Sequence, residues 1–342
     1  MHDQDVSPVG VPVCYRHPGR ETYVRCTRCD RSICPDCMRE ASVGHQCPEC
    51  VAEGKRTQRP ARTAFGATRG AGGRGYVTIG LVAINVVMLL ISIASAKTGN
   101  ALGGSGFGGL IGGDTPLLDK LAVLGQYTYD DGQTAAAGVA NGEYYRLFTA
   151  MFMHFGVIHL LMNMWALWIL GRALESMFGP LRFLALYLVC GLGGDIAAYV
   201  FQPAALSAGA STAIFGLFGA LFVALRRLKL STASVVPIIV INVVFTISVP
   251  GISIAGHLGG LATGALVGAG VAYAPQTNRA AIQAGALVGA VLLLAVIAIW
   301  QSARIHSAAT VTAAAPRHAT VSTTAPAPQY ILPWRGSGGG SG

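Results

Sequence analysis

Charged residues are scarce in this chain, and their scarcity excludes an ordinary soluble fold. Only 11% of the 342 residues are charged, whereas 52% are hydrophobic. A soluble domain usually carries about 25% charged residues, so the composition predicts a membrane protein. The formal charge of +9 does not indicate nucleic-acid binding, because the basic residues lie in linkers and in short loops between apolar runs. That distribution is typical of positive-inside anchoring in a lipid bilayer, and we expect no nucleic-acid partner.

Cysteine is almost absent from the apolar part of the chain. Seven of the eight cysteines fall within residues 14–50, and only Cys190 lies in an apolar segment, where we expect it to be a small packing residue. The first 50 residues are polar and contain no apolar run, so we expect no signal peptide. We therefore expect the cysteines to lie in a reducing compartment, where metal binding is favoured over disulfide formation.

Eight potential metal ligands share a single spacing, with two residues between the members of each pair: Cys14 and His17, Cys26 and Cys29, Cys34 and Cys37, Cys47 and Cys50. Zn²⁺ takes four N or S ligands tetrahedrally, so eight ligands predict two closed, structural zinc sites. With alternating pairs, one site takes Cys14, His17, Cys34 and Cys37, and the other takes Cys26, Cys29, Cys47 and Cys50. A region this short has too little core to fold alone, so the metals would supply the missing stability.

The ligand spacing over residues 14–50 resembles the cross-braced zinc fold of the B-box family. B-boxes usually end with histidines, whereas this chain ends with Cys47 and Cys50, so His45 competes for a place in the second site. The resemblance implies a structural or partner-binding module. Capture of a protein partner and control of the membrane domain are equally consistent with it, and the plain alternative is a module that merely caps the N-terminus.

Seven apolar segments follow, each long enough for a hydrocarbon core of about 30 Å. They are 76–96, 148–170, 181–202, 209–226, 234–250, 254–273 and 281–301. The zinc module is expected at 1–52 and a flexible basic linker at 53–75. The tail at 303–342 is rich in Ala, Thr and Pro and is expected to be disordered, ending in what resembles an engineered linker. The Arg and Lys of the loops predict a cytoplasmic N-terminus and a C-terminal tail outside.

One serine and one histidine stand near the outer ends of two predicted spans. Ser211 falls in the first turn of its helix, where backbone N–H groups lack intrahelical partners and the helix dipole is positive. His257 is ionisable within a membrane segment, which by default indicates function. Small residues recur every four positions in both spans and would allow close helix contact. We therefore expect a nucleophile and its base, although Ser211 taken alone could be a helix-contact residue.

The 148–170 span carries three further polar residues. His159 and Asn163 are four residues apart, so they share one helix face, and both can donate hydrogen bonds to an oxyanion. His154 lies nearer the outer end, where it would orient the loop or bind water. No Asp or Glu lies near the outer ends of these spans to orient His257, so a Ser–His dyad is expected rather than a triad, with no cofactor for catalysis.

In order and spacing, these residues resemble the rhomboid family of intramembrane serine proteases over roughly residues 76–273. The family's H-x4-H-x3-N pattern is matched by His154, His159 and Asn163, and its G-x-S-G pattern by Gly209-Ala210-Ser211-Thr212. His257 followed by Gly260 and Gly264 matches the sixth helix. The resemblance implies an all-α polytopic membrane protein, with a six-helix core at 76–273 and a seventh helix at 274–302. Thr212 departs from the family's glycine.

Carried over to this chain, the resemblance implies that Ser211 is the nucleophile and His257 the general base. The oxyanion hole would be formed by His159, Asn163 and the Ser211 N–H, with His154, Gly209 and Phe215 in supporting roles. Phe215 would stack on the catalytic histidine where the family often has tyrosine. The substrate would be a membrane helix cleaved near the outer face, and a bacterial plasma membrane is the expected location.

Two other functions compete with proteolysis. A catalytically silent relative would bind membrane helices and pass them on, but such a protein often lacks the serine or histidine, and both are present here. A transporter or channel would need inverted repeats or several buried charges. No such repeat is visible, and the spans carry almost no acidic residues.

Overall fold

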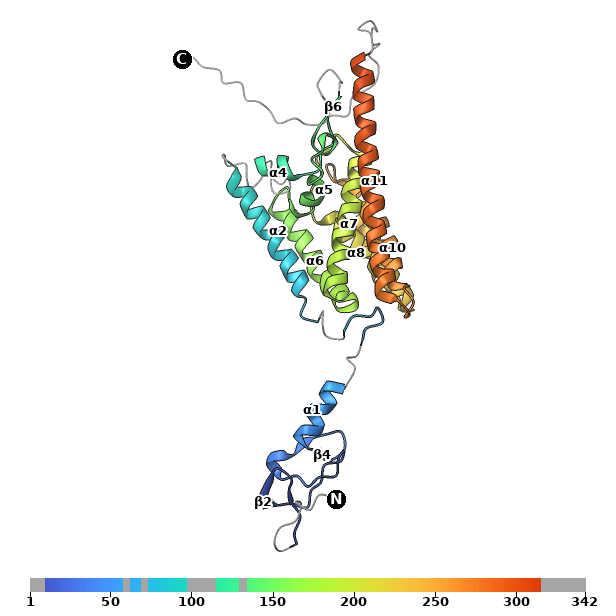
Figure 1. Cartoon of the computed structure of the whole chain (residues 1–342). Coiled ribbons are helices and arrows are strands. Elements are labelled where there is room, and N and C mark those ends of the chain that lie inside the picture. Colours follow the sequence, from blue (N-terminus) through green and yellow to red (C-terminus); the bar gives the residue numbers. More distant parts are fainter. Residues whose placement is uncertain (1–9, 58–61, 69–72, 97–114, 129–133, 315–342) are drawn as a thin grey trace, which may run out of the picture.

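The computed structural model describes residues 10–57, 62–68, 73–96, 115–128 and 134–314. It contains a small cysteine-rich module and a bundle of helices, with the module near the end of the bundle where the first bundle helix begins (Figure 1). The predicted tail beyond residue 314, including its linker-like end, lies outside the described residues.

The described part of the cysteine-rich module consists of two short hairpins, one 3₁₀ turn and one α-helix. Its elements are β1 (Val13–Cys14), β2 (His17–Glu21), η1 (Pro35–Cys37), β3 (Arg39–Glu40), β4 (His45–Gln46) and α1 (Pro48–Thr57). β1 pairs with β2 and β3 with β4, both antiparallel. The buried core consists of cysteines and Ile33, with Tyr15 and Met38 packed partly against it. So small an apolar core is consistent with a module that needs metal to stay folded.

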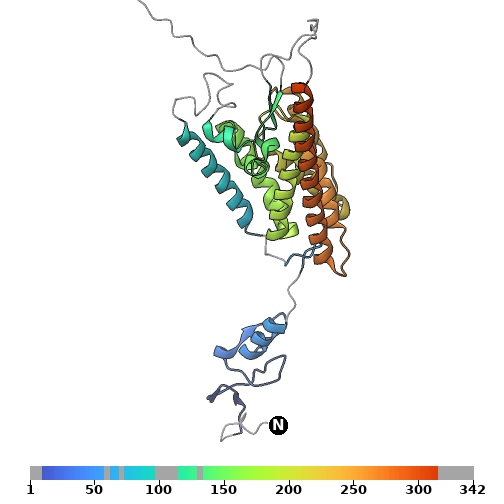
Figure 2. The ribbon, with the colours of Figure 1, turned by 45° about the horizontal axis from the view of Figure 1, so that its top comes forward.

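Within the described residues, seven helices form the bundle: α2 (Tyr76–Ser95), α6 (Val157–Phe178), α7 (Pro180–Phe201), α8 (Ser211–Arg227), α9 (Val235–Ser248), α10 (Ile254–Ala272) and α11 (Arg279–Ala314). Five described helices, α2, α6, α7, α10 and α11, are long and apolar enough to cross a membrane, whereas α8 and α9 have 17 and 14 residues. The predicted all-α polytopic membrane fold is confirmed. α2 and α11 lie on opposite flanks of the bundle in Figure 1 and in Figure 2, and α8 packs against α6, α7 and α10.

The second predicted span was misplaced. The structure has two short turns, α5 (Arg146–Thr149) and η4 (Ala150–Phe152), before α6 begins at Val157, and α6 then continues to Phe178 instead of ending near 170. The polar residues near its end do not break the helix, because each has a partner. Arg172 stacks over Trp168 at 5.1 Å, and the Glu175 carboxylate accepts hydrogen bonds from the first turn of α2.

The described parts of the predicted linker and tail contain regular structure that was not expected. α1 extends to Thr57, and residues 62–68 form a tight turn in which the Phe65 ring packs on Phe178, with centroids 4.6 Å apart. α11 continues to Ala314 instead of ending at 302. Residues 303–314 include several alanines, which favour helix, and Pro316 is the first proline after them.

The described parts of the segment between α2 and α6, residues 115–128 and 134–156, lie against the chain that leads into α8. It contains α4 (Pro116–Leu121), β5 (Gln126–Thr128), β6 (Thr134–Ala136) and η3 (Gly138–Asn141). Arg146 holds it by donating to the carbonyls of Asp119 and Ala122, at 2.5 and 3.0 Å. Val123 and Ser207 exchange two backbone hydrogen bonds of 2.8 and 3.0 Å. The loop is thereby fixed against the chain that leads into Ser211.

Close contact between α8 and α10 depends on residues without side chains. A Cβ added to Gly260 would overlap the carbonyl of Thr212, and one added to Gly264 would overlap the carbonyl of Gly216. The four-residue spacing of glycines in the sequence predicts this contact, and it is what lets two side chains near the helix ends meet.

Candidate active site and metal sites

The first turns of α8 and α10 bring one serine and one histidine together. Ser211 is the first residue of α8, and its Oγ lies 2.8 Å from Nε2 of His257. His257 is buried, at 8% exposure. The ring of Phe215 stacks on its imidazole with centroids 4.1 Å apart and an interplanar angle of 17°. The arrangement can transfer the Ser211 hydroxyl proton to His257.

Thr246 on α9 contacts the other side of the histidine, and the sequence reasoning missed it. Its Oγ1 lies 2.7 Å from Nδ1 of His257 and also donates to the carbonyl of Asn242 at 2.8 Å. A hydroxyl has one proton, so Oγ1 must accept from an Nδ1–H. Nε2 is then unprotonated and faces Ser211, which is the tautomer that a general base requires. The available signal was a hydroxyl residue within the apolar 234–250 span.

Thr246→Val should therefore lower activity without removing either member of the Ser–His pair. Leaving the buried Nδ1–H unpaired costs about 1–3 kcal/mol, which corresponds to a decrease of about 5- to 150-fold in kcat/KM. Thr246→Ser keeps the hydroxyl and should retain most activity. The measurement is kcat/KM on a membrane-helix substrate across pH. Equal activity of the Val and wild-type proteins would remove Thr246 from the site.

His159 faces the same serine across a glycine. The backbone N–H of Phe155 donates to Nδ1 of His159 at 3.4 Å, which leaves the proton on Nε2. A Cβ added to Gly209 would lie 2.9 Å from that Nε2 and 3.4 Å from Ser211 Oγ. Gly209 also has a φ of +134°, so the position favours glycine for both reasons. The His159 N–H is thus directed at the space beside the serine.

Asn163 and His154 are buried close to His159. Asn163 is 7% exposed, and its Nδ2 has no hydrogen-bond partner among the described residues, so its donor is available. His154 is 2% exposed, with its ring centroid 5.1 Å from that of His159. Neither ring nitrogen of His154 has a hydrogen-bond partner in the described part of the chain. His154 therefore packs beside His159, and Asn163 follows His159 by four residues on the same face of α6.

Thr212, the departure from the family's glycine, is accommodated by glycines on two other helices. A Cβ added to Gly194 of α7 would lie 2.6 Å from the Thr212 Cβ, and one added to Gly256 of α10 would lie 3.1 Å from its Cγ2. Thr212 is 3% exposed. Its side chain therefore fills space between α7 and α10, and the close contact of α8 with α10 is preserved.

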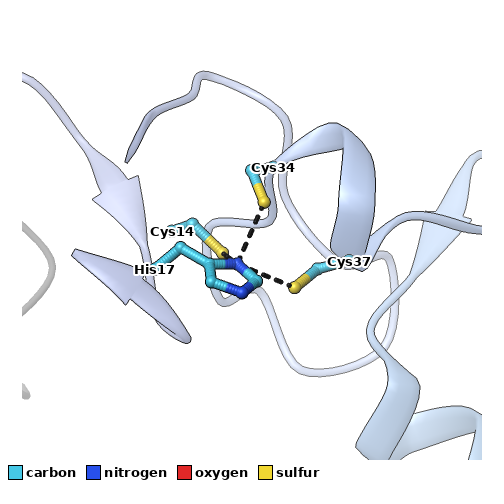
Figure 3. Close-up of side chains that lie close together, drawn as sticks. All are labelled: Cys14, His17, Cys34 and Cys37. Atoms are coloured by element: carbon cyan, nitrogen blue, oxygen red, sulfur yellow. Dashed lines mark hydrogen bonds between the residues drawn. The ribbon is translucent and has the colours of Figure 1, made fainter. Parts of the chain in front are cut away.

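The first metal-ligand cluster lies between the β1–β2 hairpin, which carries Cys14 and His17, and the η1 turn, which carries Cys34 and Cys37. His17 Nδ1 lies 3.7, 3.2 and 3.4 Å from the sulfurs of Cys14, Cys34 and Cys37, and Figure 3 shows the three thiols around the imidazole. Ligand atoms around a tetrahedral zinc ion, with bonds of about 2.0–2.3 Å, are about 3.5–3.8 Å apart. The side chains already have roughly the spacing that a metal ion would impose.

The second cluster contains four cysteines, Cys26, Cys29, Cys47 and Cys50, whose sulfurs lie within 4.8 Å of one another. Cys29 and Cys47 are 3.7 Å apart. Arg31 donates to the Cys29 sulfur at 3.3 Å, which offsets the negative charge of a four-thiolate site. His45 is not a member of the cluster. It lies in β4 and is paired with Glu40 in the β3–β4 hairpin. The alternating assignment of ligand pairs therefore agrees with the structure.

The thiols of the two clusters differ in acidity. Burial alone would raise the pKa of Cys14 and Cys26. Hydrogen bonds from backbone N–H groups to the two sulfurs outweigh that effect, and the pKa of each thiol falls to about 6. Burial and the neighbouring Cys14 raise the pKa of Cys37 to about 11. Several thiolates this close repel one another, and a bound cation relieves that repulsion. Two groups of four ligands could thus each hold a metal ion.

Comparison with known proteins identifies the membrane part. A family model described as Rhomboid domain matches residues 141–274. The putative rhomboid protease YdcA of Bacillus subtilis (strain 168) is 39% identical over 136 residues, which cover 38% of this chain and 68% of that protein. This chain belongs to the rhomboid family. Ser211, His257, His159 and Asn163 all lie within the matched Rhomboid domain.

Two further relatives are similar over a larger part of this chain. Rhomboid protease GluP of Bacillus subtilis (strain 168) is 41% identical over 174 residues, covering 49% of this chain and 33% of GluP. RHOMBOID-like protein 6, mitochondrial, of Arabidopsis thaliana is 36% identical over 175 residues, covering 49% of this chain and 54% of that protein. The matched part of this chain therefore spans about a third of GluP and about half of the Arabidopsis protein. The family membership and the helices together indicate a multi-pass membrane protein.

Proposed function

We propose that this rhomboid protein is an intramembrane serine endopeptidase that cleaves membrane-helix substrates. The observation that carries the proposal is the 2.8 Å contact between Ser211 Oγ and the unprotonated Nε2 of His257, with Thr246 holding the tautomer. Ser211 Oγ attacks the scissile carbonyl while its proton passes to Nε2 of His257. His257 then returns that proton to the leaving amine, and the acyl-enzyme is hydrolysed by water.

Hydrogen-bond donors beside Ser211 would stabilise the negative charge that develops on the carbonyl oxygen of the substrate. The Nε2–H of His159, the amide of Asn163 and the Ser211 backbone N–H are the candidates, and the positive end of α8 adds to them. His154 supports His159 by packing beside it. Gly209 keeps the space open, and Phe215 fixes the plane of the His257 ring.

Substrate class and topology follow from the position of this site. An intact helix hides its peptide bonds, because each carbonyl is already hydrogen-bonded, so the substrate helix must unwind near the bundle end that holds Ser211. We assign that end to the outer side, with the N-terminal module in the cytoplasm and the end of α11 outside, because Arg172, Arg182, Arg226 and Arg227 all lie at the opposite end. We place the protein in a bacterial plasma membrane, in keeping with its Bacillus relatives.

We assign the chain to functional parts in the same way. Residues 76–273 are the protease core, and α11 is a seventh helix beside it. The two four-ligand clusters hold structural zinc, which suits a set of thiolate and imidazole donors with no open position. The module would then dock a protein partner or control the protease from the cytoplasmic side.

Labelling with a fluorophosphonate probe tests for an activated nucleophile. Purified wild-type protein in detergent should be labelled at Ser211, because His257 removes the hydroxyl proton as the phosphorus is attacked. Ser211→Ala should abolish the label, whereas Ser176→Ala, which removes an exposed hydroxyl of α6, should not. Folded wild-type protein that resists the probe would favour a non-catalytic protein that binds membrane helices.

A further inference from the structure

Three arginines from distant parts of the sequence surround one glycine at the end of the bundle opposite Ser211. Arg62 belongs to the 62–68 turn and donates from Nη1 to the carbonyl of Gly66 at 3.4 Å. A Cβ added to Gly66 would lie 3.3 Å from Nη1 of Arg279 and 3.8 Å from Nη2 of Arg182. Three guanidinium groups thus face a common space, although like charges repel one another.

This space is a cavity of about 400 Å³. Its polar lining comes from Arg62, Thr63, Arg182, Gln276 and Arg279, and no carboxylate is among its lining residues. None of the three arginines belongs to an ion pair within the described part of the chain. The first turns of α7 and α11 also lie here, and helix N-termini add positive potential. The positive charge of the three guanidinium groups is therefore not balanced by any residue that lines the cavity, and a bound anion would balance it.

The cavity is built on ordered side chains. Gln283 is 2% exposed and links three segments, because its amide nitrogen donates to the carbonyls of Phe65 and Val271, at 3.2 and 2.9 Å, while its oxygen accepts from Nε of Arg182 at 2.6 Å. Phe65, 3% exposed, anchors the 62–68 turn in the bundle. Arg182 is thus held in place with Nη2 directed towards Gly66.

We propose that the Arg62–Arg182–Arg279 cavity binds a phosphate group and that this phosphate fastens the 62–68 turn to the bundle. Guanidinium groups match the geometry of phosphate oxygens and bind them with charge-assisted hydrogen bonds. Because α7 and α11 begin here, the cavity lies where a transmembrane helix reaches the membrane surface, within reach of anionic phospholipid headgroups. A phosphate group of a soluble compound has the same chemistry. The site does not depend on the proposed proteolysis.

Hydrogen exchange of the full-length protein in a neutral detergent tests the proposal. Within the turn, Gly66 N–H donates to the carbonyl of Thr63, Ala67 N–H donates to Oγ1 of Thr63, and Thr63 N–H donates to the carbonyl of Ala67. Exchange at these three amides therefore reports whether the turn is closed. Phosphatidylglycerol or inorganic phosphate should slow exchange within residues 62–68 and raise the Tm. An effect of the lipid alone assigns the phosphate to a headgroup, and an effect of inorganic phosphate assigns it to a soluble source. No effect of either, or an equal effect of phosphatidylcholine, would overturn the proposal.

A matched pair of charge variants separates this cavity from the general positive charge of the bundle end. Arg62→Gln/Arg279→Gln should weaken phosphate binding about tenfold for each guanidinium removed. Without phosphate it should be no less stable than wild type, because repulsion is relieved. Arg226→Gln/Arg227→Gln removes the same charge at the end of α8 and should bind normally. Equal weakening in both variants would overturn the site. If the double variant does not fold, the single variant Arg62→Gln provides the test and should weaken phosphate binding about tenfold. It should fold, because Arg62 is exposed and lies outside the bundle helices.

Discussion

Replacing Ser211 with alanine should abolish cleavage of a membrane-helix substrate, and replacing His257 with alanine should do the same. Each variant removes one partner of the 2.8 Å contact on which proton transfer depends. In a serine protease of another fold, loss of the nucleophile or its base lowers kcat by about 10⁶-fold, so cleavage here should fall to the background rate. The measurement is the rate of product formation by purified protein reconstituted in vesicles with a fluorogenic transmembrane substrate.

The controls for this prediction separate chemistry from folding. Ser211 is small and partly exposed at a helix start, so Ser211→Ala should keep the wild-type Tm. His257→Ala leaves a space beside Phe215, and His257→Gln, which fills more of it but is not a base, should be equally inactive. Ser176→Ala should be fully active. Cleavage above background by folded Ser211→Ala protein would show that another residue is the nucleophile.

Removing metal should unfold the cysteine-rich module and leave the membrane bundle folded. Binding of a structural zinc ion contributes about 10–16 kcal/mol in small zinc modules, which equals or exceeds the whole stability of an ordinary domain of about 5–15 kcal/mol. The module has a core of cysteines and Ile33 and little else to replace that contribution. Elemental analysis should find two zinc ions per chain, and a chelator should remove protection from hydrogen exchange across residues 10–57 but not across α6, α7 and α8.

A pair of cysteine variants locates the metal. Cys26→Ala should lower the zinc content from two to about one per chain, because its cluster retains three ligands and loses affinity. Cys190→Ala is the control, since Cys190 is buried in α7 and belongs to neither cluster. One zinc ion or none in the wild-type protein would show that the two clusters are not two sites. Equal loss of metal from both variants would point to a general effect on folding.

Local patterns in the sequence were enough for several of these features. The four ligand pairs could be identified because each pair spans a single turn, and in the structure the alternating pairs form two groups of four that could each hold a metal ion. Ser211 and His257 could be paired because glycines at four-residue intervals mark a close helix contact. The ends of α7, α8 and α10 were predicted within two residues, since apolar length alone limits a membrane helix.

Contacts between distant segments could not be predicted in this way. Thr246 could be noticed as a hydroxyl residue in an apolar span, but its contact with His257 could not be predicted, because nothing in the apolar run of α9 shows which of its faces is buried. α6 was misplaced because Arg172 and Glu175 look like loop residues until their partners, the ring of Trp168 and the first turn of α2, are known.

The sequence by itself determined that this is a multi-helix membrane protein. It also showed eight cysteines and histidines with metal-ligand spacing, and a serine and a histidine in helices whose regularly spaced glycines indicate close contact. These features depend only on the composition and on the spacing of residues that are close in the sequence, so they are the same whatever the arrangement of the helices. The tertiary structure alone decided that His45 is outside the second cluster, that Thr246 faces His257, and that Arg62, Arg182 and Arg279 share one cavity. Each of these three findings depends on how segments of the chain pack against one another, and short sequence patterns do not specify that packing.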